Sequence, residues 1–261
     1  MNAFKLVYLY WRIAILNELQ YRINFFLQLF QSLIALLVGW VGLALIFRQT
    51  SDLAGWTSPE LLVVLGVYTL MGGVVRAFVF PSMFRLLQDI TEGNLDFALT
   101  KPADSQLLVS VREVQIWQLI DVLLGLLVIL YGESQLPHSA SPLAILAFAF
   151  ALLMGILLMY CFCICITTIA FWATRADNII ELFQGVYQAG RVPVGIYPQW
   201  LRILLTFLVP VAIAITIPAE AITQRLTVQN SLVAFVFTLF VVIFTRWLWQ
   251  TGVKSYAGAS A

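Results

Sequence analysis

The sequence predicts an all-α, polytopic membrane protein with six transmembrane helices. Hydrophobic residues make up 62% of the 261-residue chain and charged residues only 10%, whereas soluble domains are about 45–50% apolar and about 25% charged. Residues 23–47 contain no charged side chain, and about 20 apolar residues cross a hydrocarbon core roughly 30 Å thick. The apolar runs are continuous rather than alternating, so helices rather than barrel strands must satisfy the backbone in lipid.

Residues 1–22 are predicted to form an amphipathic helix that lies on the membrane surface. Tyr8 and Trp11 recur at helical spacing in an apolar face, while Lys5 and Arg12 lie on another face. The charged residues interrupt any early apolar core, so this segment does not have the pattern of a cleaved signal peptide.

Five later apolar runs predict clear spans, and a sixth span has two rival positions. The clear spans cover residues 23–47, 61–80, 113–131, 142–172 and 230–249. The apolar run at residues 142–174, which contains the fourth span, is too long for one perpendicular crossing, because about 33 residues at 1.5 Å each give roughly 50 Å. For the sixth, residues 203–219 are uncharged but contain two prolines, whereas residues 177–196 carry three charged side chains. Either choice places both termini on the same side.

The distribution of basic residues predicts that both termini are cytoplasmic. In this orientation Arg48 and Arg225 lie outside, and the remaining basic residues in the loops and at the ends of the spans lie inside, namely Lys5, Arg12, Arg22, Arg85, Lys101, Arg112, Arg175, Arg246 and Lys254. Residues 81–112 then form a cytoplasmic loop between the second and third spans.

The motifs of several enzyme and binding classes are missing. The sequence has no G-x-x-x-x-G-K-[ST] loop, so the chain is not expected to bind nucleotide phosphates itself. A single histidine, His138, with no G-x-S-x-G or H-E-x-x-H motif argues against a serine hydrolase, a metalloprotease or a histidine-rich metal site. The sequence contains no basic run of the kind that binds nucleic acid. We therefore expect neither an enzyme nor a cofactor-binding chain.

Two charged residues are predicted inside the spans. Arg76 lies near the inner end of the second span, and Asp121 lies some eight residues into the third, about 12 Å deep at helical rise. Either charge alone is costly in lipid, so we hypothesise that the two pair and lock adjacent helices. Snorkelling of Arg76 to the interface and a contact with substrate are the alternatives.

The predicted cytoplasmic loop combines charge with an apolar pattern unusual for a passive linker. We expect a short amphipathic helix at residues 83–91, broken by Gly93 and ended before Pro102, that presents its apolar side chains to a groove on a partner. Its charged residues would set register and specificity. The candidate contact residues are Phe84, Leu87, Ile90, Glu92, Gly93, Leu95, Asp96, Leu99 and Pro102.

Two stretches resemble the exporter permeases of the ABC type-2 family. The stretch DITEGNLDFALTKPADSQLLVS resembles their loop, in which an acidic residue, a Gly, several leucines and a Pro recur in this order. The stretch RVPVGIYPQWLRILLTFLVPVAIAITIPAEAITQR resembles their later proline-rich segment. The amphipathic start, six spans and orientation agree, so the resemblance extends over nearly the whole chain.

The resemblance implies a choice between the two rival positions of the remaining span. It makes residues 177–196 this span, the fifth in chain order, and residues 198–222 a re-entrant helical hairpin before the last span. This choice places Arg202 outside, against the tendency of basic residues to lie on the cytoplasmic side. The hairpin residues that it singles out are Pro198, Trp200, Leu201, Pro210, Pro218 and Glu220.

The resemblance also implies a function. The chain would be the membrane subunit of an ATP-driven exporter in a bacterial plasma (inner) membrane, pairing with a second permease copy or homologue. Separate ABC ATPase subunits would bind ATP and Mg and drive transport through the loop at residues 81–112. The alternatives are a membrane scaffold for a cytoplasmic partner, and a secondary transporter, for which inverted repeats and more buried ionisable residues are expected.

Overall fold

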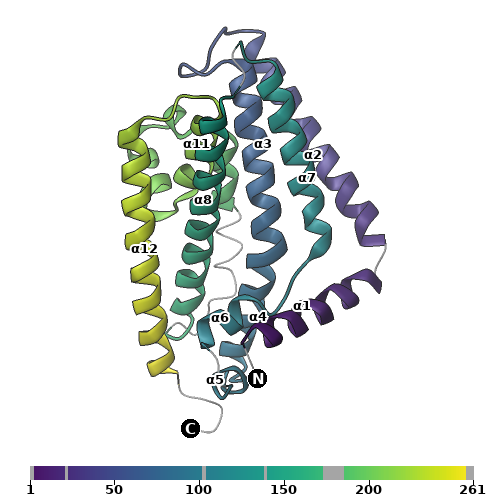
Figure 1. The fold of residues 1–261 in the computed structure, drawn as a ribbon, viewed down its shortest axis with the longest axis vertical. Coiled ribbons are helices and arrows are strands. Elements are labelled where there is room, and N and C mark those ends of the chain that lie inside the picture. Colours follow the sequence, from purple (N-terminus) through teal and green to yellow (C-terminus); the bar gives the residue numbers. More distant parts are fainter. Residues whose placement is uncertain (1–2, 21–22, 102–103, 138–139, 173–184, 257–261) are drawn as a thin grey trace.

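A computed structural model describes residues 3–20, 23–101, 104–137, 140–172 and 185–256. The described residues form a helical bundle without named strands, which confirms the predicted all-α class. The described chain begins and ends at the lower end of the bundle, where α1 (Ala3–Gln20) runs at an angle to the long helices (Figure 1). Among the described residues, the helices long and apolar enough to cross a membrane are α2 (Ile23–Phe47), Ser58–Thr91, Ile116–Ser134, α8 (Pro142–Ile169) and α12 (Val228–Ser255).

A single long helix runs from Ser58 to Thr91, where we predicted a span ending at residue 80 and a separate loop helix. It consists of α3 (Ser58–Val74), the π-helical turn η1 (Val75–Val79) and α4 (Phe80–Thr91). Pro81 does not end it, although proline lacks the N–H that would bond the carbonyl of residue 77. The Gln115 N–H bonds the Ala77 carbonyl instead, at 2.9 Å. The helix ends before Gly93, whose φ of 75° suits glycine.

The following helices begin and end at slightly different residues from the predicted spans. Ile116–Gln118 forms the 3-10 turn η2, and α7 (Leu119–Ser134) follows it, so the residues at 113–115 are not helical. α8 ends at Ile169, before residue 172. Two short helices, α5 (Asp96–Leu99) and α6 (Ser105–Ser110), fold beside α4 at the lower end of the bundle (Figure 1).

The segment before the last helix is broken several times. Residues 177–184 of the predicted fifth span lie outside the described residues. Residues 188–196 contain only the 3-10 turns η3 (Gln188–Arg191) and η4 (Val194–Ile196), so no straight helix extends to residue 196, because Pro193 lies between the turns. Next, α10 (Gln199–Ile203) and η5 (Leu204–Leu208) form one leg, and α11 (Val211–Ile222) forms a second leg, bent by 93° from the first.

Glycines let the central helices approach one another closely. A Cβ atom on Gly125 of α7 would lie 2.5 Å from the Leu70 backbone nitrogen and 2.7 Å from the Gly66 carbonyl oxygen of α3. A Cβ atom on Gly155 of α8 would lie 2.8 Å from the Ala214 carbonyl of α11. Small residues at such contacts allow van der Waals packing to hold helices together in lipid, so α3, α7, α8 and α11 form the packed centre.

In contrast, α2 lies at the edge of the bundle (Figure 1). Within its 25 residues only Ser32 and Leu43 are buried. Leu36 and Phe47 also pack against the core of the bundle, but most of the apolar side chains of α2 are exposed and remain available to lipid or to other ligands.

Replacement of Gly125 by alanine is expected to destabilise the bundle. The added methyl would clash with the backbone of α3, and overpacking typically costs about 1–3 kcal/mol. We expect a lower temperature of thermal unfolding for purified Gly125→Ala in detergent. The matched control is Gly42→Ala in α2, where nothing lies within 4 Å of the added atom. Alanine is the better helix former by about 1 kcal/mol, so this control should be neutral or stabilising, and equal destabilisation of both variants would contradict the packing.

Candidate functional site

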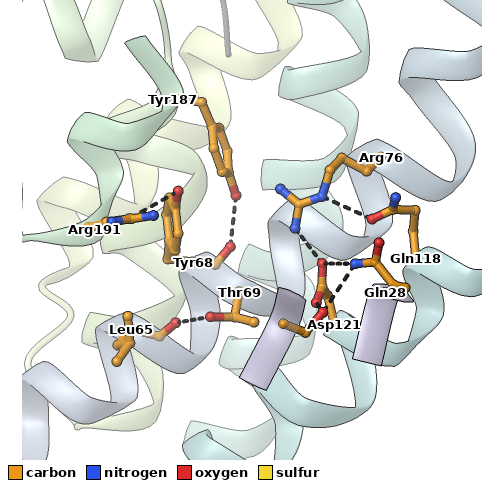
Figure 2. A network of polar contacts seen from close by, with 10 residues as sticks. Gln28, Leu65, Tyr68, Thr69, Arg76, Gln118, Asp121, Tyr187 and Arg191 are labelled. Atoms are coloured by element: carbon orange, nitrogen blue, oxygen red, sulfur yellow. Dashed lines mark hydrogen bonds and ion pairs between the residues drawn. The ribbon is translucent and has the colours of Figure 1, made fainter. Parts of the chain in front are cut away.

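A network of polar side chains lies between the long helix and α7. The structure places Arg76, in η1, next to Asp121, with 2.6 Å between Nη2 and Oδ2 (Figure 2). The Arg76 Nε–H also donates to the Gln118 side-chain oxygen at 3.1 Å. A π-helical turn is often found at functional sites, and here it carries the arginine of the network.

The same carboxylate also binds α2. Gln28 donates through Nε2 to Asp121 Oδ2 at 3.2 Å, and the Ser32 hydroxyl donates to the other carboxylate oxygen. Asp121 is only 3% exposed. One carboxylate therefore joins three helices, and its partners offset the cost of removing a charge from water.

Asp121 lies nearer the end of its helix than we predicted. The expected depth of eight residues assumed a span beginning at residue 113, but α7 begins at Leu119 and Asp121 belongs to its first turn. A carboxylate in the first turn of a helix interacts favourably with the positive end of the helix dipole. The geometry thus supplies a second reason for an acidic residue at this position.

A polar cavity of about 230 Å³ opens beside this network. The Tyr68 ring forms part of its wall and stacks on Tyr187 with 5.0 Å between the ring centroids. Arg191, from η3, lies over the same Tyr68 ring at 5.5 Å (Figure 2). The cavity is lined by Gln28, Gln31, Ser32, Ala35, Leu36, Leu65, Tyr68, Thr69, Arg76, Gln118, Asp121 and Arg191.

Sequence reasoning missed the α2 side of this site. Gln28 and Ser32 are four residues apart, and Asn24, Gln28 and Gln31 follow helical spacing within an otherwise apolar span. Uncharged polar residues on one face of a spanning helix are a usable signal for a polar contact, because hydrocarbon satisfies none of their hydrogen bonds.

Most of the apolar residues predicted to contact a partner are packed inside the chain. Leu87, Ile90 and Leu95 are buried, Leu95 with 0% exposure, and Leu99 packs against the same core. In the described conformation these apolar side chains are not exposed to a partner. The reason is that α4 packs against α6 and α8, so its apolar face belongs to the core of the chain itself.

The exposed surface of α4 is a different set of residues. Phe84, Gln88 and Thr91 follow one another at helical spacing and are exposed, with Arg85 and Glu92 beside them. Only Phe84 and Glu92 belong to the predicted contact set. Of the other predicted residues, Gly93 and Asp96 are half-buried, and Pro102 lies outside the described residues.

Ion pairs hold α4 and α6 in place at the end of the bundle. The buried Asp89 carboxylate pairs with Arg85 in the same helix and with Arg112 after α6. Asp104 accepts a hydrogen bond from the Leu107 N–H at 3.1 Å at the start of α6 and pairs with Arg246 of α12. The hydrogen bond from Arg246 holds the pKa of Asp104 below its ordinary value. The end of the bundle is thus cross-linked between distant parts of the sequence.

The predicted hairpin residues lie at the breaks and along the legs. Pro198 precedes α10, Pro210 precedes α11 and Pro218 lies inside α11. The residues Trp200 and Leu201 belong to α10, where Trp200 is exposed. Near the end of α11, the Glu220 carboxylate accepts a hydrogen bond from Asn230 at 3.4 Å. The described residues contain no group of three His, Cys, Asp or Glu side chains that could hold a metal ion.

The Arg76–Asp121 pair is expected to show a larger coupling energy than an exposed pair. We propose a double-mutant cycle with Arg76→Gln and Asp121→Asn, measured by unfolding in detergent, with an expected coupling of about 0.5–3 kcal/mol. The control cycle uses Arg246→Gln and Asp104→Asn, because both of those side chains are more than 40% exposed and such pairs contribute about 0.2–1 kcal/mol. Equal coupling in the two cycles would argue against a lock between α7 and the long helix.

Comparison of the sequence with known protein families identifies the family of this chain. The family described as ABC-2 family transporter protein matches residues 33–260. No match was found among curated proteins or among solved structures. The matched region contains most of α2 and all of the long helix, α7, α8, the bent pair of legs and α12. It also includes the two sequence stretches that carry the resemblance. This chain belongs to the ABC-2 transporter family and is a multi-pass membrane protein.

Proposed function

We propose that the chain is the transmembrane permease subunit of an ATP-binding cassette exporter in a bacterial inner membrane. Separate ATPase subunits bind ATP and Mg, and a second permease copy or homologue completes the transport path. The family supports a role in membrane transport, whereas the direction of transport and these partners are part of the proposal. The chain itself takes no part in ATP chemistry, because it lacks a phosphate-binding loop.

The observation that carries this proposal is the continuity of the long helix. Its lower part presents the exposed stripe of α4, and its η1 turn carries Arg76 of the polar network. Gln88 and Arg76 are twelve residues apart, which is about 18 Å along a helix. A displacement applied to α4 therefore reaches Asp121 and α2 through one element, without a flexible joint between them.

The proposed ATPase contact is the surface formed by Phe84, Arg85, Gln88, Thr91 and Glu92. Its central apolar ring, Phe84, is 40% exposed and is surrounded by polar and charged side chains. A buried aromatic anchor within a polar rim is typical of protein interfaces. Ion pairs of Asp89 and Asp104 keep the supporting helices in place, so the surface is presented on a rigid base.

Combined replacement of Phe84 by aspartate and Gln88 by arginine is expected to weaken the ATPase contact. Loss of the anchor and introduction of charge should reduce co-purification of the ATPase subunit and substrate-stimulated ATPase activity about tenfold, as expected for a loss of roughly 1.4 kcal/mol. Insertion and thermal unfolding of the permease should remain unchanged, because both side chains are exposed.

The matched control is Gln135→Arg, an exposed residue after α7 at the opposite end of that helix from Asp121. It should leave both readouts unchanged. Leu95→Asp serves a different purpose, because Leu95 is fully buried and its replacement should unfold the end of the bundle. Normal co-purification by the Phe84/Gln88 variant would contradict the proposed contact. Co-purification without stimulated ATPase activity in the unmodified complex would favour a scaffold.

A further inference from the structure

An apolar groove lies between α2 and the helices α3 and α7. Its volume is about 460 Å³, within the roughly 300–1,000 Å³ typical of ligand sites. Several lining side chains, including Leu37, Trp40 and Leu127, are more than half exposed, so the groove is open rather than part of the core. It is lined by Leu33, Leu36, Leu37, Trp40, Leu62, Leu65, Leu124, Leu127, Val128 and Tyr131.

The apolar groove adjoins the polar cavity described above. Leu36 and Leu65 line both spaces. Along α2, Gln28 lies in the polar cavity and Trp40 lies in the apolar groove, twelve residues or about 18 Å apart. The lining that α2 contributes to the two spaces therefore changes from hydrogen-bonding to hydrocarbon character over a distance comparable to a lipid chain.

A third cavity extends the polar end towards α1. It has a volume of about 240 Å³ and shares Gln28, Gln31 and Gln118 with the first cavity. Trp117 also lines this cavity. Its indole N–H is buried and has no hydrogen-bond acceptor among the described residues, and a buried donor without an acceptor costs free energy.

The charges of the polar cavity favour an anionic group. Its lining contains two guanidinium groups and one carboxylate, and that carboxylate of Asp121 is already bound by Arg76 and α2. Arg191 is exposed, lines the cavity and donates to the Tyr68 hydroxyl at 3.4 Å. In the described part of the chain no carboxylate pairs with Arg191. A guanidinium group presents several N–H donors that match phosphate oxygens.

We propose that this combined site binds an anionic phospholipid. Arg191 and the cavity edge at Arg76 hold the phosphate, the amides at the foot of α2 contact the polar head, and one acyl chain lies in the groove beside Leu36, Leu37 and Trp40. Glu18 lines the far end of the third cavity, so the phosphate lies at the arginine end. This binding goes beyond the proposed export function, because it requires neither nucleotide nor a partner subunit.

Photo-crosslinking of a lipid probe tests the site. The probe is phosphatidylglycerol with a diazirine in one acyl chain, added to the purified full-length protein in nanodiscs without nucleotide, and phosphatidylcholine with the same chain is the reference. Mass spectrometry should locate the crosslinks on the lining positions of residues 33–40 and 124–131, with about tenfold more labelling by phosphatidylglycerol, equivalent to about one charge-assisted hydrogen bond.

Two variants, with one control, test the binding of the lipid headgroup and of the acyl chain separately. Leu127→Trp fills the groove and should reduce labelling at residues 33–40 at least fivefold, whereas Leu130→Trp, an equally exposed position of α7 outside the groove, should not. Arg191→Gln should remove the preference for phosphatidylglycerol but leave chain labelling in place. Equal labelling of the two tryptophan variants, or no headgroup preference in the unmodified protein, would overturn the proposal. Neither result depends on ATPase coupling, which is measured separately.

Discussion

The arrangement of α2, the long helix and α7 depends on the buried carboxylate of Asp121. Its charge is unfavourable in an apolar surrounding unless donors surround it. Arg76, Gln28 and Ser32 supply these donors from two neighbouring helices. Because α2 has few other buried side chains, this carboxylate fixes the position of its lower half. A change in the long helix is therefore transmitted to α2 through these hydrogen bonds as well as through the apolar contacts of Leu36, Leu43 and Phe47.

A second constraint links the continuity of the long helix to the position of that carboxylate. Pro81 leaves the Ala77 carbonyl without its helical donor, and Gln115 supplies the missing N–H. Gln115 immediately precedes η2 and α7. The contact that satisfies the backbone of the long helix thus also brings Gln118 and Asp121 beside Arg76. The hydrogen bond between the Gln115 N–H and the Ala77 carbonyl therefore both completes the backbone bonding of the long helix and positions the polar network.

The two ends of this system are packed differently. At the lower end, the apolar face of α4 is buried, and ion pairs of Asp89 and Asp104 join α4, α6 and α12. Along α2, most apolar side chains remain exposed, and cavities follow its inner face. Such a difference suits a protein in which a rigid end receives a partner and a loosely packed helix borders a ligand site, because little apolar packing is lost when α2 moves.

The sequence by itself determined the membrane class and the helical fold, because the backbone N–H and C=O groups of a continuous apolar segment in lipid must bond one another within that segment. It also suggested the neighbouring positions of Arg76 and Asp121, since each charge alone is costly there. Only the tertiary structure decided that Leu95 belongs to the core, because an apolar helical face fits a partner groove and its own chain equally well. It alone decided that the helix continues through Pro81, because the compensating Gln115 N–H is distant in sequence and no local pattern reveals it.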